Sequence, residues 1–513
     1  MNGADALIST LVANEVTACF ANPGTSEMQF VAALDGVPQM RPVLCLFEGV
    51  ATGAADGYGR IADRPACTLL HLGPGYGNGV ANLHNARRAF TPIVNVVGDH
   101  ATYHRQYDAP LNSDIATLVK PNSIWVKSAD APDQVSALAA EAVAASYGPP
   151  GGPVSLILPA DSAWLEAKGG PVIAQKPVRP APSGEAVDAA ARALRAARKP
   201  VVLLGNQACR AEALKEAARL EAAGITVYSD TFVPRQRRGA GTFLPKKMQY
   251  FGEMALSELE GVDLMVLVGT AMPVAFFAYP NRPSVLVPEG CETLTLAERS
   301  EDSVVGLAAL ADALGAPKEG PVQPLVLPDA APTGGLNAYF AGASIARHMP
   351  EDAIVCDDAV TSGTGVAVGT ATARPHDLLA LTGGAIGIGL PLAVGAAVAA
   401  PDRKVISLNG DGAAMYTVQA LWTMARENLD VTTVVFANNT YRILNVEMTR
   451  TGAGQAGPAA ARLLDLGDPA IDWVSMAKAM GIPAVRCTTA EEFDKAFADA
   501  VAQRGPMFIE AVI

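Results

Sequence analysis

A strand, a helix and a second strand are predicted between residues 404 and 441, and this unit limits how the whole chain can fold. The two β-branched runs, 405–408 and 431–436, predict buried parallel strands. Residues 413–427 between them are rich in helix formers, with apolar residues at helical spacing. Because parallel strands joined by a helix end at the same edge of a sheet, we expect Asp411 and Asn438 to lie side by side, roughly 5 Å apart.

The residues at these two strand ends suit a bound metal and phosphate. Asp411 lies between Gly410 and Gly412, and Asn438 is followed by Asn439 and Thr440. Two oxygen side chains and a turn carbonyl are ligands that Mg²⁺ accepts. The glycines let a phosphate approach the backbone, and a helix beginning near residue 413 points its amide dipole at that phosphate. The sequence predicts a metal-bridged diphosphate site, although Gly-Asp-Gly alone is also typical of a tight strand-to-helix turn.

The spacing of Gly-Asp-Gly and Asn-Asn resembles the diphosphate motif of thiamine-diphosphate-dependent enzymes, the superfamily of acetolactate synthase, benzoylformate decarboxylase and pyruvate decarboxylase. The resemblance implies that Mg²⁺ is held by the Asp411 and Asn438 side chains and the Thr440 carbonyl. Ala437 stands where many relatives place the first asparagine of the pair. The resemblance also implies a cofactor-binding set at this end of the chain: Gly410, Asp411, Gly412, Ala413, Asn438, Thr440 and Tyr441.

The composition indicates a large and well-packed globular protein. The chain has 513 residues, of which 50% are hydrophobic and 17% charged, enough for about three domains. A net charge of −13 argues against nucleic acid or an anionic membrane as a partner. The seven cysteines form no metal or disulfide pattern. We recognise neither a signal peptide nor an apolar run of membrane-spanning length, so a cytoplasmic location is expected.

Helix and strand signals alternate in three blocks, which predicts an α/β fold of three doubly wound parallel-sheet domains. The expected domains are residues 1–164, 185–315 and 335–513, separated by proline-rich linkers. The first and third blocks look like distant copies, because each has a predicted glycine-rich loop before a small-residue helix, at 72–79 and 383–391. The resemblance implies that the first domain binds the pyrimidine ring of the cofactor and the third binds its diphosphate.

Glu48 is the leading catalytic candidate. It follows the apolar run 43–47, an expected strand, and precedes a helix of small residues. An apolar setting would raise the pKa of its carboxyl group towards neutrality. The resemblance implies that Glu48 shares a proton with the pyrimidine ring and so activates the cofactor. The alternative is a strand-end glutamate that faces solvent or caps the next helix.

Further candidates come from glycine-rich segments and strand ends. The resemblance implies that Ile386 bends the cofactor, and that the Gly384 carbonyl holds its amino group. Thr361 and Ser362 are expected diphosphate donors, although isolated hydroxyls also cap helices.

His71 and Thr25 are the expected residues near the substrate. His71 ends the predicted strand 67–71, and it stands where benzoylformate decarboxylases carry an active-site histidine. Thr25 stands where they carry a serine. A structural histidine at a strand end is the alternative for His71.

The resemblance implies decarboxylation of a 2-keto acid, followed by protonation to an aldehyde or carboligation to a 2-hydroxyketone. Two departures leave the substrate open. Residues 270–282 lack the second histidine of benzoylformate decarboxylases, and Leu111 stands where acetolactate synthases have a glutamine. A lyase acting on 2-hydroxyacyl thioesters and a non-catalytic relative with the same fold are the alternatives. The active sites are expected at the interface of a homodimer or homotetramer.

Overall fold

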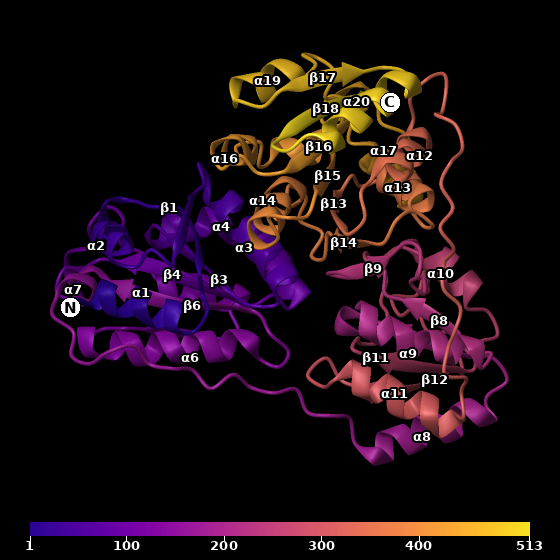
Figure 1. The fold of residues 1–513 in the computed structure, drawn as a ribbon, viewed down its shortest axis with the longest axis horizontal. Coiled ribbons are helices and arrows are strands. Elements are labelled where there is room, and N and C mark those ends of the chain that lie inside the picture. The colour runs from indigo at the N-terminus through magenta and orange to yellow at the C-terminus, as the bar shows by residue number, and fades with distance from the viewer.

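The computed structural model describes residues 1–513 and arranges them around three sheets (Figure 1). The first sheet has six parallel strands in the order β2-β1-β3-β4-β6-β5. Its strands are β1 (Ala18–Asn22), β2 (Arg41–Leu44), β3 (Ala66–Leu70), β4 (Ile93–Asp99), β5 (Val126–Ser128) and β6 (Pro153–Pro159). The helices around it are α1 (Gly3–Ala13), α2 (Met28–Ala33), α3 (Glu48–Ala62), α4 (Leu72–Ala89), α5 (Ile115–Val119), α6 (Val135–Tyr147) and α7 (Ala160–Trp164).

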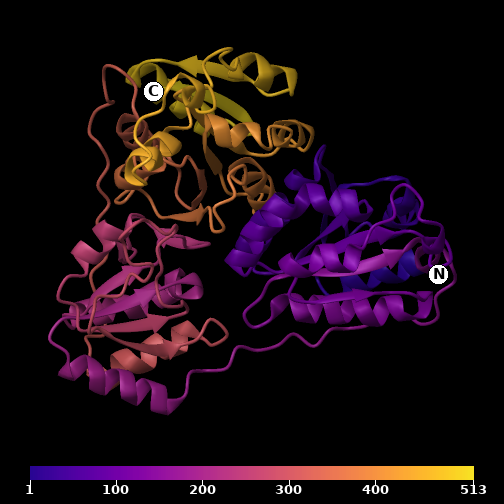
Figure 2. The ribbon, with the colours of Figure 1, turned by 180° about the vertical axis from the view of Figure 1, so that it is seen from behind.

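The middle sheet has five parallel strands in the order β10-β8-β7-β11-β12. Its strands are β7 (Pro200–Leu204), β8 (Thr226–Ser229), β10 (Lys246–Lys247), β11 (Leu264–Val268) and β12 (Glu292–Ala297). Its helices are α8 (Gly184–Ala196), α9 (Ala211–Ala222), α10 (Gly252–Glu258) and α11 (Ser303–Leu314). Two long segments without helices or strands join it to its neighbours and run along the outside of the molecule (Figures 1 and 2).

The third sheet has seven strands in the order β17-β18-β16-β15-β13-β14-β9. Its strands are β9 (Gln236–Arg238), β13 (Ala353–Asp358), β14 (His376–Ala380), β15 (Val405–Gly410), β16 (Val431–Ala437), β17 (Ala484–Cys487) and β18 (Met507–Val512). Its helices are α12 (Ala338–His348), α13 (Gly363–Gly369), α14 (Gly389–Ala399), α15 (Asp411–Met415), α16 (Ala420–Arg426), α17 (Arg442–Arg450), α18 (Pro458–Ala461), α19 (Trp473–Ala479) and α20 (Ala490–Ala502). The expected α/β fold with three largely parallel, doubly wound sheets is confirmed.

One strand crosses between units. β9 belongs by sequence to the middle block, but it pairs antiparallel with β14 at the edge of the third sheet. Pairing between segments about 140 residues apart leaves no local trace in the sequence, so this strand was not predicted.

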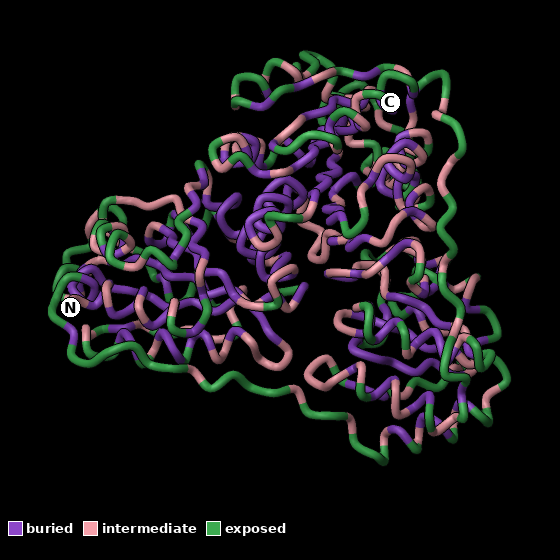
Figure 3. The backbone as a smooth tube through the Cα atoms, viewed as in Figure 1, coloured by how far each residue is buried: buried purple, intermediate pink, exposed green.

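The first and third sheets share one hydrophobic core. Its 45 buried residues include the face of the first sheet under α3 and the face of the third sheet under α14. The two helices touch backbone to backbone, because a Cβ on Gly57 would lie 2.0 Å from the Leu392 carbonyl oxygen. The middle sheet has separate cores of its own. Figure 3 shows the buried chain continuous between the first and third units.

Three local expectations were wrong. Residues 413–427 form two helices, α15 and α16, because Thr417 turns inward and donates its hydroxyl to the Gly387 carbonyl at 2.7 Å. The strand expected at 43–47 ends at Leu44, before the chain turns into α3. The glycine-rich segment 72–79 is the first half of helix α4 and not a loop. A Cβ at Gly79 would lie 2.7 Å from Thr52 Cγ2, so this glycine serves close packing between helices α4 and α3.

No helix of the structure combines the length and the apolar character needed to cross a bilayer.

Candidate active site

The Asp411 turn lies where β15 and β16 end side by side, with Gly410 in register with Phe436. Asp411 is 4% exposed, and its Oδ2 accepts hydrogen bonds from the backbone N–H groups of Asn438 at 3.0 Å and Asn439 at 2.7 Å. Burial raises the pKa of this carboxyl group, and the N–H groups act in the opposite direction. The expected juxtaposition of the two strand ends is confirmed.

The oxygen atoms of this turn fit a hard divalent cation. Asn438 Oδ1 accepts one hydrogen bond, from the Thr440 backbone N–H at 3.0 Å, and the Thr440 carbonyl accepts one from Arg442 at 2.9 Å. Each oxygen therefore keeps a lone pair for another partner. The structure contains no group of three or more His, Cys, Asp or Glu side chains that could hold a metal. One carboxylate, one amide oxygen and one carbonyl form a different donor set, and it is one that Mg²⁺ accepts.

The aromatic ring of Tyr441 packs directly on the turn. A Cβ at Gly412 would lie 2.2 Å from Tyr441 Cε1, so only glycine admits this contact. Ala413 follows in the first turn of α15 and is buried. Thr361 and Ser362 lie between β13 and α13, and neither side-chain hydroxyl hydrogen-bonds a protein group, which leaves both free for a ligand.

Asp358 at the end of β13 holds the glycine-rich loop before α14. Its Oδ2 accepts from the backbone N–H groups of Gly387, Ile388 and Gly389 at 2.8, 3.0 and 3.2 Å. Burial raises the pKa of this carboxyl group to about 7. Asp358 was not predicted as a site residue, and the acidic pair Asp357 and Asp358 is its only signal in the sequence.

Asn85 of α4 hydrogen-bonds the same glycine-rich loop from the side opposite Asp358. Asn85 Oδ1 accepts from the backbone N–H groups of Gly383 at 3.1 Å and Ala385 at 3.3 Å, and its Nδ2 donates to the Ala385 carbonyl at 2.8 Å. Gly384 lies between them with φ +79°, and its carbonyl accepts no hydrogen bond from the protein. Ile386 beside it is half-buried. The loop is thus held on both sides of Gly384, and the Gly384 carbonyl stays free to accept from a ligand.

Glu48 is the first residue of α3 and is 6% exposed. Its Oε2 accepts a hydrogen bond from Asn78 Nδ2 at 3.0 Å. A Cβ on Gly75 would lie 3.2 Å from Glu48 Oε1, so the glycine in α4 makes room for the carboxylate. The carboxyl group is therefore buried against α4 and does not face solvent. Glu48 does not cap α3 either, because the N-cap residue is Phe47 and no side chain caps this helix.

His71 precedes α4, and a buried carboxylate fixes its ring. Its Nδ1 lies 2.9 Å from Oε2 of Glu27 and 3.2 Å from Oγ of Ser26. Thr25 is exposed and its side chain makes no hydrogen bond in the structure. The role of Glu27 was not predicted, because its contact with His71 joins residues 44 positions apart.

The candidates form two half-sites in one chain. Glu48 and His71 belong to the first sheet, Asp411 and Asn438 to the third, and no hydrogen bond or ion pair joins the two sets. Exposed apolar side chains adjoin both halves: Met28 and Leu46 at the first, and Val360 and Tyr416 at the second.

Comparison with known proteins identifies the family. The "Thiamine pyrophosphate enzyme, N-terminal TPP binding domain" matches residues 1–118, and the "Thiamine pyrophosphate enzyme, C-terminal TPP binding domain" matches residues 361–511. A Mycobacterium tuberculosis protein named "Putative acetolactate synthase large subunit IlvX" is 51% identical, covering 100% of this chain and 99% of that protein. Benzoylformate decarboxylase of Pseudomonas aeruginosa is 30% identical, with 96% of both chains covered.

A solved structure shares the whole fold. The thiamine diphosphate-dependent 4-hydroxybenzoylformate decarboxylase of Rhodococcus jostii RHA1 superposes with a TM-score of 0.87 at 26% identity, covering 100% of this chain and 99% of that one. The chain belongs to the thiamine-diphosphate-dependent enzymes.

Proposed function

We propose that this enzyme, with thiamine diphosphate and Mg²⁺, decarboxylates a 2-keto acid and completes the reaction by protonation or carboligation. The observation that carries the proposal is a buried glutamate, Glu48, in the same chain as an Asp411 turn with free oxygen lone pairs. Relatives named for benzoylformate decarboxylase and acetolactate synthase support a 2-keto acid substrate.

The third sheet provides the anchoring residues in this proposal. Asp411, Asn438 and the Thr440 carbonyl hold the cation, and their oxygen atoms all lie in this turn. Around it, the diphosphate is bound by a set of small and hydroxyl-bearing residues: Gly410, Gly412, Ala413, Thr361, Ser362 and Tyr441. When bound, thiamine diphosphate supplies an electron sink for the electrons that remain after loss of CO₂.

The residues around the reacting end orient and move protons. The free Gly384 carbonyl would accept a hydrogen bond from the amino group of the cofactor, and the Ile386 side chain would pack against the cofactor. Glu48 holds a proton at a ring nitrogen of the pyrimidine. Asn78 donates to the Glu48 carboxylate and so orients it.

Proton transfer to the product is assigned to His71. Glu27 and Ser26 engage Nδ1, which leaves Nε2 as the nitrogen that can face the substrate. The buried carboxylate of Glu27 fixes the ring, so that the proton is delivered from one direction. Thr25, exposed beside this pair, is assigned to the substrate-facing surface.

The proposed active unit is a homodimer or a homotetramer, with each active site at an interface between subunits. Support comes from the two half-sites and the exposed apolar side chains beside them, since a partner subunit would cover both. A cytoplasmic location is also proposed, supported by seven cysteines that form no disulfide.

The test is a substrate panel with product identification. The purified chain with thiamine diphosphate and Mg²⁺ is incubated with small, branched and aromatic 2-keto acids, alone and in pairs, and products are identified by mass spectrometry. We expect an aldehyde or a 2-hydroxyketone from at least one acid, and none from the Asp411→Ala variant. Absence of CO₂ release and of both products across the panel would refute the proposal.

A further inference from the structure

Helix α17 begins where the turn assigned to the metal ends. The Thr440 carbonyl accepts the backbone N–H of Arg442 at 2.9 Å, and Asn445 Nδ2 donates to the Thr440 hydroxyl at 3.3 Å. Tyr441, whose ring packs on Gly412, is the N-cap residue of this helix. The positions of the Thr440 carbonyl and the Tyr441 ring therefore depend on how α17 is held.

The hydrophobic cores of the chain do not hold this helix. None of its nine residues is buried, and none belongs to a hydrophobic core cluster or packs against one. An isolated helix of this length is at best marginally stable in water, because its first turn fixes several residues for a single hydrogen bond. Helix α17 therefore depends on polar and aromatic contacts with its surroundings.

The polar contacts of α17 lead to the middle unit. Arg450 Nη1 and Nη2 donate to the two carboxylate oxygens of Glu253, in α10, at 2.5 and 2.7 Å. Tyr279, in the segment after β11, donates its hydroxyl to Glu447 Oε2 at 2.7 Å. The other side-chain hydrogen bonds of the helix stay within residues 440–451. The middle unit is thus the only hydrogen-bonding partner of these side chains outside that segment.

Aromatic rings of the middle unit strengthen this contact. The guanidinium carbon of Arg450 lies 3.8 Å from the centroid of the Phe251 ring and 5.3 Å from that of Tyr279. Bidentate charge-assisted hydrogen bonds and stacking on aromatic rings are both stronger than an ordinary surface ion pair. Hydrogen bonding to Arg450 lowers the pKa of Glu253 to about 2, so the carboxylate is ionised at neutral pH.

The same aromatic cluster touches the second loop assigned to the cofactor. Phe276 packs on Gly384, where a Cβ would lie 2.5 Å from the ring atom Cζ. The Phe276 ring centroid is 5.5 Å from that of Tyr250, which in turn lies 5.0 Å from that of Phe251. One series of neighbouring rings therefore joins the Gly384 loop to Arg450.

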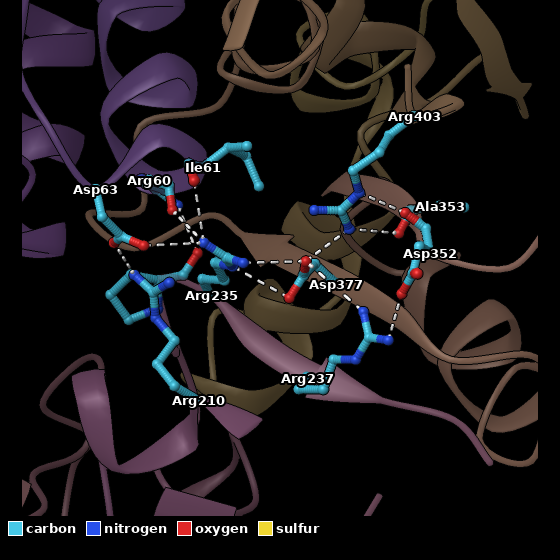
Figure 4. A network of polar contacts seen from close by, with 11 residues as sticks. Arg60, Ile61, Asp63, Arg210, Arg235, Arg237, Asp352, Ala353, Asp377 and Arg403 are labelled. Carbon is cyan, nitrogen blue, oxygen red and sulfur yellow. Dashed lines mark hydrogen bonds and ion pairs between the residues drawn. The ribbon is translucent and has the colours of Figure 1, made fainter. Parts of the chain in front are cut away.

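The middle unit has a separate attachment to the other two units (Figure 4). Arg235, directly before β9, donates through Nε and Nη2 to Asp377 of β14 at 3.1 and 3.2 Å. Its Nη1 donates to the carbonyls of Arg60 and Ile61, in α3, at 3.0 and 3.3 Å. Asp377 is buried and also pairs with Arg403 at 2.6 Å. With this network in place, the contacts with α17 are a second attachment, which can be removed without detaching the middle unit.

We propose that Glu253 and Tyr279 of the middle unit are positioning residues for the cofactor site, because they hold α17 and with it the Thr440–Tyr441 turn. The inference rests on the proposed function, in which this turn binds Mg²⁺ and diphosphate. The middle unit contributes none of the residues assigned to the cofactor, so these contacts give it a part in cofactor binding. When they are lost, apparent affinity falls with the fraction of molecules in which α17 is in place.

The experiment has two readouts on the full chain. Backbone hydrogen–deuterium exchange of peptides covering residues 440–452, followed by mass spectrometry without cofactor, measures how firmly α17 is held. Calorimetry with thiamine diphosphate and Mg²⁺ measures cofactor affinity. The variants are Glu253→Gln, Tyr279→Phe and the double substitution. Glu260→Gln is the matched control, because Glu260 is exposed and its carboxylate forms no hydrogen bond or ion pair.

We expect exchange in α17 to be about 3- to 10-fold faster in each single variant, and faster again in the double variant, because each loses a partly exposed polar contact. Exchange in α3 and the thermal midpoint should stay at the wild-type values, which separates positioning from a general loss of stability. Thiamine diphosphate should bind about 3- to 10-fold more weakly to Glu253→Gln, and Glu260→Gln should match wild type.

Wild-type exchange in the double variant would overturn the proposal, and so would faster exchange with unchanged cofactor affinity. A wild type that binds no thiamine diphosphate would refute the proposed function and this inference with it. Binding by wild type with equal affinity in the variants would refute this inference alone. Should Glu253→Gln fail to fold, Tyr279→Phe decides, because it removes one hydroxyl and keeps the ring beside Arg450.

Discussion

Asp358 is expected to make the stability of the third unit depend on pH. Its Oδ2 accepts three backbone N–H groups, whereas Oδ1 is buried without a partner. Asn409 stands in register with it on β15, and Asn409 Oδ1 is also buried and unpaired. A proton on Asp358 Oδ1 would satisfy both oxygens, which agrees with a pKa raised by burial to about 7.

The sign follows from the raised pKa. Between the ordinary pKa of 3.8 and about 7, the folded protein keeps a proton that the unfolded chain releases. The free energy of unfolding therefore falls as pH rises, by about 1.4 kcal/mol per pH unit, and levels off above pH 7. Asp358→Asn replaces the protonated acid by an amide, which donates to Asn409 and keeps an oxygen for the three N–H groups. In this variant, the contribution of residue 358 to the free energy of unfolding should not fall as pH rises.

Urea denaturation of wild type and Asp358→Asn at pH 5, 6, 7 and 8 measures the difference. We expect the variant to gain about 2 kcal/mol relative to wild type between pH 5 and pH 7, and only about 0.3 kcal/mol more by pH 8. Asp472→Asn is the control: Asp472 caps α19, and hydrogen bonds from the Ser475 side chain and backbone lower its pKa below 3.8, so it is ionised in both states from pH 5 to pH 8 and its difference from wild type should not change with pH. A stability difference independent of pH would show that Asp358 is ionised throughout, and the account of the loop would be wrong.

Three further outcomes are expected. Asp411→Ala should abolish Mg²⁺-dependent binding of thiamine diphosphate in calorimetry with an unchanged circular dichroism spectrum; undiminished affinity would contradict the metal assignment. Glu48→Gln keeps the hydrogen bond from Asn78, so cofactor affinity should stay near normal while hydrogen–deuterium exchange at the cofactor's C2, followed by NMR, slows on the order of 10²- to 10⁴-fold. Exchange at the wild-type rate would make Glu48 structural. Light scattering should show at least a dimer, and a fully active monomer would remove the interface model.

The parts of this protein predicted from sequence depend on contacts between near neighbours in the chain. The strands and helix around Asp411 follow from local apolar periodicity, and the rule that parallel strand ends meet at one edge then places Asn438. The break between α15 and α16 could not be predicted from this periodicity, because it depends on the hydrogen bond from the Thr417 hydroxyl to the Gly387 carbonyl.

The supporting residues of the site could not be predicted for the same reason. Nothing in the local sequence distinguishes Asn85 from other helix residues. Its role depends on the contact that the fold makes between α4 and the backbone of Gly383 and Ala385. Glu27 looks like a helix cap, and it is also the partner of His71. Such roles arise from contacts across long stretches of chain, which one sequence does not encode locally.

The shared core has a consequence for how the chain is made. The outer side of helix α3 is buried by α14, which lies more than 300 residues later in the chain. During synthesis, that side of α3 is complete but uncovered while the middle unit, which has its own cores, emerges and folds. A nascent chain halted before α14 therefore exposes an apolar surface that chaperones bind, and the first unit reaches its final stability only when the last sheet leaves the ribosome.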